Sequence, residues 1–99
     1  MPKSAFSANS QAKACASAVA TLLAGRSPAA PKLINTCYSL AAPGYGISVA
    51  GVYLPKNGVF ADVDGAGGVS PADAPADFRA REAGYAQSWF ATTTAEVFG

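Results

Sequence analysis

The chain has 99 residues, of which 51% are hydrophobic and 13% charged, and its formal net charge is +1. This length predicts a single domain over residues 1–99. The near-neutral charge argues against nucleic acid as a partner, and no apolar run is long enough to predict a membrane span. A charged fraction this low is unusual for a free-standing domain, so we expect other protein to cover much of the surface.

The chain contains two cysteines, Cys15 and Cys37, and no histidine. Two thiols do not complete a zinc site, and the lack of histidine removes the commonest metal ligand. We therefore predict no metal site. A disulfide between the two cysteines remains open, although nothing in their spacing demands it.

The first predicted element is a helix that begins after Ser4 and ends before Gly25, which are suitable residues for the two caps. Its apolar residues recur at helical spacing and predict one buried stripe: Ala8, Ala12, Cys15, Ala16, Val19, Leu22 and Leu23. On this pattern Cys15 has a packing role and is shielded from solvent. Residues 27–31 are rich in proline and alanine and predict a linker.

Three strands are predicted next, over residues 33–41, 47–54 and 59–63. The turn sequences PGYG at residues 43–46 and Asn57-Gly58 make them an antiparallel meander. The apolar run around Cys37 predicts a buried strand, in which Cys37 shares one face with Leu33 and Asn35.

A glycine-rich loop at residues 64–69 follows the meander. It lacks the G-x-G-x-x-G pattern and follows a hairpin, so the chain has no dinucleotide-binding fingerprint. Residues 70–73 resemble a capping box, with Pro75 as a second helix start, and the helix is predicted to run to about Ala91, where three threonines break it. The predicted fold is therefore α+β, with the last helix covering one face of the sheet.

The predicted core consists of larger side chains drawn from all of these elements, because alanine buries little area. Its members are Leu22, Leu23, Leu33, Ile34, Ile47, Val49, Val52, Phe60, Phe78, Tyr85 and Trp89.

Three stretches together resemble one protein family: MPKSA at residues 1–5, LINTCYSL at residues 33–40 and YGISVAGVY at residues 45–53. The chain resembles the C-terminal domain of the flavoprotein subunit of flavocytochrome c sulfide dehydrogenase. The resemblance extends over essentially the whole chain. It implies the C-terminal interface domain found in FAD-linked disulfide reductases, and it implies that the chain is the tail of a longer protein, called the parent below.

The resemblance also implies roles for single residues. Cys37 is implied to be half of a redox-active disulfide whose partner lies upstream, although free cysteines are more often small buried hydrophobes. The helix start at Ser4, Ala5 and Phe6 is implied to point at the flavin, although from the sequence alone an ordinary capped helix explains it better. Trp89 is implied to pack near the isoalloxazine ring, although aromatic residues late in a helix usually belong to the core.

The function implied by the resemblance is oxidation of sulfide to sulfur or polysulfide, with electrons passing through FAD to a c-type cytochrome subunit in the periplasm. The parent would be the enzyme. The chain alone lacks the main FAD-binding residues, so we expect it to depend on the FAD-binding domains of the parent. In that case Cys37 is accessible in the isolated chain. The alternative is a non-catalytic module that self-associates through its alanine-rich helix and an open sheet edge.

Overall fold

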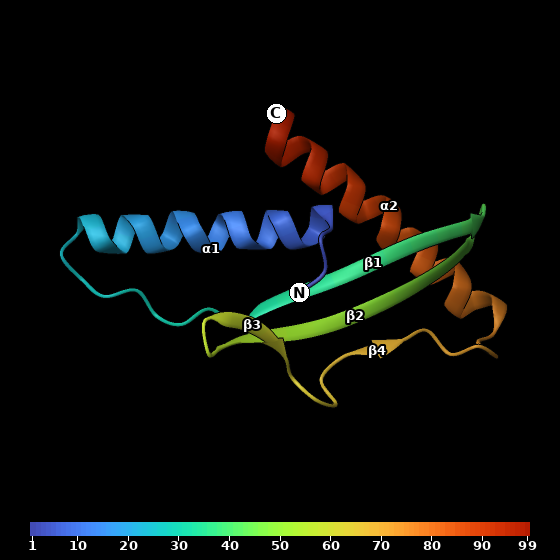
Figure 1. Cartoon of the computed structure of the whole chain (residues 1–99). Coiled ribbons are helices and arrows are strands. Elements are labelled where there is room, and N and C mark those ends of the chain that lie inside the picture. Colours follow the sequence, from blue (N-terminus) through green and yellow to red (C-terminus); the bar gives the residue numbers. More distant parts are fainter. The chain divides into compact units, whose positions relative to one another are not determined.

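The computed structural model describes all 99 residues and has the expected α+β composition. Two helices, α1 and α2, flank the strands β1 to β4 in the sequence (Figure 1). The chain divides into two compact units, which we describe separately. The α1 unit comprises residues 1–36 and 50–67, and the α2 unit comprises residues 37–49 and 68–99. Neither helix combines the length and the hydropathy that a membrane crossing requires.

Helix α1 spans Ala5–Leu23, and the sequence predicted both of its ends. Ser4 is the N-cap, because its hydroxyl oxygen accepts a hydrogen bond of 3.1 Å from the backbone N–H of Ser7. Gly25 has a φ of 75°, the left-handed conformation that commonly ends a helix. The chain then turns into the proline- and alanine-rich segment that leads to β1.

The sheet has the order β1-β2-β3, and the short strand β4 also pairs with β2. The strands are β1 (Leu33–Ala42), β2 (Tyr45–Lys56), β3 (Val59–Asp62) and β4 (Gly68–Val69). The register between β2 and β3 pairs Tyr53 with Asp62 and Lys56 with Val59. Asn57 and Gly58 both have positive φ, 51° and 79°, as the predicted two-residue hairpin turn requires.

Helix α2 spans Ala76–Phe98, so the second predicted start at Pro75 is confirmed, whereas the first predicted start and the predicted end near Ala91 are wrong. The capping box does not form. Ser70 instead accepts a 2.8 Å hydrogen bond from the backbone N–H of Ser48, and Pro75, the second predicted start, is the N-cap. The three threonines do not break the helix, because each costs only a few tenths of a kcal/mol, and the Thr94 hydroxyl donates to the carbonyl of Phe90 at 2.7 Å.

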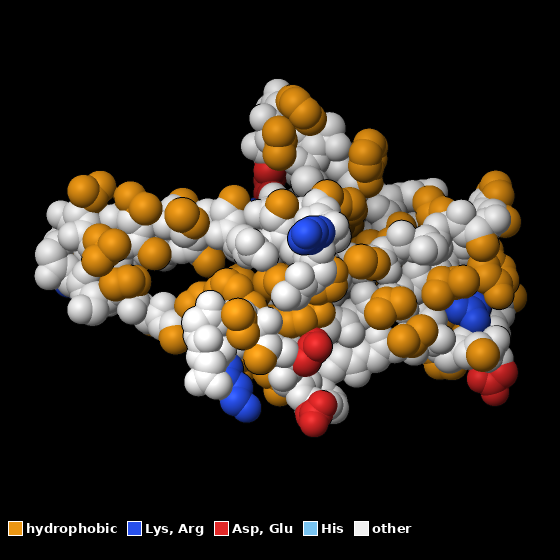
Figure 2. All heavy atoms as spheres, viewed as in Figure 1, with side chains coloured by type: hydrophobic (Ala, Val, Ile, Leu, Met, Phe, Trp, Pro, Cys, Tyr) orange, Lys and Arg blue, Asp and Glu red, His pale blue; other side chains and the backbone are white.

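The core is smaller than predicted. Its buried hydrophobic members are Leu33, Tyr53, Ala83 and Ala86. Five of the predicted core residues are exposed instead: Leu22, Leu23, Ile34, Val49 and Tyr85. The predicted apolar stripe of α1 is likewise exposed, reaching 85% at Leu23, and Figure 2 shows apolar side chains along this helix. The side of α1 that turns inward carries small and polar residues such as Ser7, Ala14, Ala18 and Thr21.

Candidate functional site

The start of α1 is joined to β1 by a small polar network. The hydroxyls of Ser4 and Ser7 both donate to the side-chain oxygen Oδ1 of Asn35, at 2.5 Å and 2.9 Å. Ser7 and Asn35 are buried, with 2% and 3% of their surface exposed. Ser10, one turn further along the helix, adds a 3.3 Å bond from its hydroxyl to the carbonyl of Ile34. The first turns of α1 are therefore fixed to the strand by hydroxyl groups and not by apolar packing.

An open pocket of about 480 Å³ lies at this helix start. Its lining consists of Met1, Pro2, Lys3, Ser4, Ala5, Ser7, Ala8 and Gln11. The first turn contains no acidic residue, so no carboxylate offsets the partial positive charge of the helix N-terminus. Lys3, which also lines this pocket, adds a positive charge beside the helix start. Ser4, Ala5 and Phe6, the residues predicted from the sequence, thus lie at one end of one helix.

Cys37 lies in β1 but is exposed, so the prediction of a buried strand was wrong at this residue. The reason is a change of side along the strand. Leu33 and Asn35 are buried on the odd-numbered side, whereas beyond them Thr36 and Tyr38 are the more buried residues. The expected accessibility of Cys37 is confirmed, and a reagent in solution can reach its side chain.

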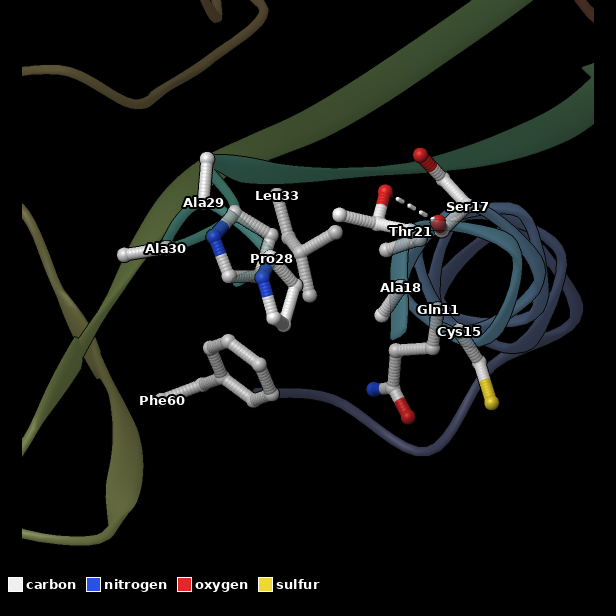
Figure 3. Close-up of a pocket in the computed structure, with 12 residues that line it drawn as sticks. Gln11, Cys15, Ser17, Ala18, Thr21, Pro28, Ala29, Ala30, Leu33 and Phe60 are labelled. Carbon is white, nitrogen blue, oxygen red and sulfur yellow. Dashed lines mark hydrogen bonds between the residues drawn. The ribbon is translucent and has the colours of Figure 1, made fainter. Parts of the chain in front are cut away.

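Cys15 is also exposed, so the predicted shielding of this cysteine was wrong. It borders a pocket of about 600 Å³ in the α1 unit, where Leu33 and Phe60 face the helix (Figure 3). The pocket is lined by Gln11, Ala14, Cys15, Ser17, Ala18, Thr21, Pro28, Ala29, Ala30, Pro31, Leu33 and Phe60. Both cysteines are thiols and both are exposed. Exposure alone therefore does not show which of them is reactive.

Trp89 is half-buried in the α2 unit and lines a pocket of about 400 Å³. The other residues of this pocket are Tyr38, Leu40, Ala86, Gln87 and Phe90. Three aromatic side chains around one hollow can stack on a flat ring. The structure places Ser4, Ala5 and Phe6 together in the α1 unit, and it places Cys37 and Trp89 in the α2 unit.

The sequence did not reveal a buried arginine in the α2 unit. Arg79 is only 4% exposed, and its Nη2 donates to the carbonyls of Pro71 at 2.5 Å and Ala72 at 3.3 Å. Its guanidinium lies over the ring of Tyr45, 5.1 Å from the centroid. The atoms Nε and Nη1 of Arg79 and Oε2 of Glu82 are buried without a hydrogen-bond partner. No motif in the sequence marks an arginine on this helix as buried.

Tyr38 lies near the same acidic residue. Its burial, and then the negative charge of Glu82 and the neighbouring Tyr85, raise the pKa of the Tyr38 hydroxyl above its ordinary value. Tyr38 therefore remains protonated at neutral pH and can act as a hydrogen-bond donor in its pocket. No group of three or more histidine, cysteine or acidic residues lies together as a metal site would need.

Residues 29–98 match the family described as flavocytochrome c sulphide dehydrogenase, flavin-binding. The match spans most of the sequence, and the chain therefore belongs to this family. The family predicted from the three short stretches is confirmed, and two of the stretches, residues 33–40 and 45–53, lie inside the match, whereas residues 1–5 lie outside it. The family identity supports FAD as the cofactor of the parent and an oxidoreductase as the parent enzyme. The match includes Asn35, Cys37 and Trp89 but not the residues of α1.

Proposed function

We propose that the chain is the C-terminal part of a sulfide-oxidising flavoprotein, in which Cys37 forms one half of a redox-active disulfide. The observation that carries this proposal is the position of Cys37, an exposed thiol, within the segment that matches a flavin-binding family. Cys15 is also exposed but lies outside that segment. The second cysteine of the bridge would come from the upstream part of the parent.

The chemistry follows from thiol–disulfide exchange. Hydrosulfide attacks one sulfur of the bridge, which forms a persulfide on one cysteine and releases the other cysteine as a thiolate. A second hydrosulfide would attack the outer sulfur of the persulfide, which forms a new S–S bond in the released disulfane and leaves both cysteines as thiolates. FAD, when bound in the parent, would accept the two electrons that these thiolates release as their disulfide re-forms. Cys37 is thus assigned the covalent step, and its exposure leaves room for a small anion to approach.

The remaining predicted residues would hold the cofactor. The partial positive charge at Ser4, Ala5 and Phe6 would stabilise the negative charge of the reduced flavin, which raises the electron affinity of the flavin. Trp89 would pack against the isoalloxazine ring from its aromatic pocket. Since the chain lacks a dinucleotide-binding fingerprint, the phosphates of FAD would be bound by the upstream domains.

The partner and the compartment belong to the same proposal. The family name joins a flavoprotein to cytochrome c, so we propose a c-type cytochrome subunit as the electron acceptor. We propose a periplasmic location for the complex, where such a subunit and sulfide would meet. The isolated chain is proposed to have no activity of its own.

The test is the variant Cys37→Ser in the flavin-loaded parent, with Cys15→Ser as the matched control. Serine cannot form the bridge, so flavin reduction by sulfide should become far slower, while FAD remains bound because its main ligands lie upstream. Stopped-flow absorbance measures the rate. If Cys37→Ser stays within about tenfold of wild type, or roughly 1.4 kcal/mol of barrier, the assignment of Cys37 is wrong.

The exposed apolar side chains of α1, Val19, Leu22 and Leu23, favour a second candidate function. In this alternative the chain is a non-catalytic module that dimerises through the alanine-rich helix and an open sheet edge. The absorption spectrum of the purified parent, combined with its sedimentation, separates the two functions, because the isolated chain is expected to be colourless in either case. A flavin absorption band supports the flavoprotein, whereas a colourless parent that dimerises supports the module.

A further inference from the structure

Ser7 and Asn35 are the two buried polar side chains of the α1 unit. Buried polar groups are retained at a cost unless they are hydrogen-bonded. Here the two are bonded to one another over 2.9 Å, although 28 residues separate them in the sequence. A buried link between distant segments fixes the position of one segment on the other.

The link acts on the first turn of the helix. Oδ1 of Asn35 accepts from the N-cap hydroxyl of Ser4 as well as from Ser7, and the Ser4 oxygen in turn accepts from the N–H of Ser7. One amide oxygen on the strand therefore holds both the cap and the third residue of α1. Removing the amide would leave the Ser7 hydroxyl buried without this acceptor and would free the helix start to move.

We propose that Asn35 is a positioning residue for the flavin and acts through the start of α1. This inference rests on the proposed function, in which that helix start faces the flavin. The influence of a helix dipole falls off within about one turn, so a small displacement of the first turn changes the field at the ring. Asn35 lies in the segment that matches the flavin-binding family, whereas α1 lies outside it.

A purely stabilising role for Asn35 would have the same hydrogen bonds, so the experiment measures stability and redox potential separately. In the flavin-loaded parent, Asn35→Leu should lower the equilibrium constant for flavin reduction about fivefold, which is about 20 mV for a two-electron couple. Ser7→Ala should shift the potential in the same direction, and it serves as the second variant if Asn35→Leu does not fold. Both variants should also unfold at a lower temperature.

Ser10→Ala is the matched control, because it removes another link from α1 to β1, the bond to the carbonyl of Ile34, and leaves the cap intact. This control should lower the unfolding temperature without moving the potential. If Asn35→Leu and Ser7→Ala move the potential no more than Ser10→Ala does, Asn35 only stabilises the fold and the inference is overturned.

Ala5→Asp distinguishes that failure from a failure of the proposed function. It places a carboxylate on the exposed first turn of α1, so it should make the potential more negative wherever the helix start faces the flavin. A shift with Ala5→Asp but not with the Asn35 and Ser7 variants overturns the role of Asn35 alone. No shift with any of the three overturns the proposed orientation of the helix and the inference with it.

Discussion

The two units of this chain attach a helix to a strand in different ways. In the α1 unit the attachment is a neutral network, in which the hydroxyls of Ser4 and Ser7 meet the amide oxygen of Asn35. In the α2 unit the backbone of α2 lies directly against Gly46 of β2, and a buried arginine binds the loop that precedes the helix. The first attachment depends on hydrogen bonds between side chains, and the second on backbone proximity and a buried charge.

This difference predicts how each attachment fails. The α1 network loses one hydrogen bond at a time, which typically costs about 1 kcal/mol net. The α2 contact leaves no room for an added atom, and closely packed backbone cannot shift locally. A single substitution at the α2 contact should therefore lower the free energy of unfolding more than a single substitution in the α1 network does.

The substitution Gly46→Ala tests the closest contact in the α2 unit. A Cβ atom there would lie 2.6 Å from the carbonyl carbon of Glu82, and the neighbouring atoms are also backbone. Because the helix itself must move, we expect a loss of about 3 kcal/mol in the free energy of unfolding. Urea denaturation followed by the fluorescence of Trp89, the single tryptophan, measures the change.

Gly84→Ala is the matched control for Gly46→Ala. Gly84 lies in α2 with nothing within 4 Å of an added Cβ, so alanine should stabilise the helix by about 0.5–1 kcal/mol. If the two substitutions changed the free energy of unfolding equally, the backbone contact of Gly46 with α2 would not limit stability.

Arg79→Ala tests the buried charge. It removes the bonds from Nη2 to the carbonyls of Pro71 and Ala72 and the stacking on Tyr45. We expect a loss of about 2 kcal/mol, again measured by urea denaturation. Arg79→Met should cost less than Arg79→Ala, because methionine keeps apolar volume in the buried site. Both variants remove the unpartnered Nε and Nη1.

Arg81→Ala is the control on the same helix. Its 3.2 Å ion pair with Asp77 is largely in solvent, with 58% and 70% of the two side chains exposed. Such a pair contributes about 0.5 kcal/mol or less. If Arg79→Ala costs no more than Arg81→Ala, the buried guanidinium does not hold the loop to the helix.

The features that the sequence predicted correctly depend on a few neighbouring residues. The Ser4 cap, the end of α1 at Gly25 and the Asn57-Gly58 turn each follow from local backbone preferences. The order of the two helices and the first three strands was correct for the same reason, whereas the strand β4 lies in the predicted loop and pairs with β2. The first predicted start of α2 was wrong because Ser70, a good cap by its local sequence, bonds to Ser48, which lies 22 residues earlier.

The features that the sequence did not predict depend on which side of an element meets another element. The apolar stripe of α1 was expected inside, yet Ser7 and its small neighbours face the strand, where Ser7 bonds to Asn35. The change of buried side after Asn35 also exposes Cys37. The sequence does indicate that Asn35 has hydrogen-bond partners, because an asparagine in an apolar strand needs them. It does not indicate which residues these partners are.

Each unit contains one hairpin turn with a glycine of positive φ, so substitutions at these glycines test whether the two units unfold independently. Gly58 (79°) closes the β2–β3 hairpin in the α1 unit, and Gly44 (71°) closes the β1–β2 hairpin in the α2 unit. Alanine at either position should cost about 1 kcal/mol, because the left-handed conformation is strained for it. Hydrogen exchange should show lost amide protection mainly in the unit that contains the substitution. Equal loss in both units would show that they unfold together.

The smallest expected effect concerns the pH dependence of the α2 unit. Burial, then Glu82 and then Tyr85, raise the pKa of Tyr38 above the ordinary value of 10.0. The unfolded chain then ionises first as the pH rises. The contribution of Tyr38 to stability is therefore present below about pH 10 and is lost as the pH rises through the folded pKa. Tyr38→Phe should lose less stability than wild type between about pH 9 and pH 11, measured by urea denaturation with Trp89 fluorescence.

Glu82→Gln serves as the companion variant for this last test. It removes one of the charges that raise the Tyr38 pKa. The part of the tyrosinate absorbance that is lost with Tyr38→Phe should therefore appear at a lower pH than in the wild-type chain. The shift should be modest, because burial is the larger cause and Glu82→Gln leaves it in place. Two results together would contradict the raised pKa of Tyr38. In the first, Tyr38→Phe and the wild-type chain lose stability in parallel as the pH rises, and in the second, Glu82→Gln leaves the titration unchanged. The alkaline sensitivity would then arise from other groups.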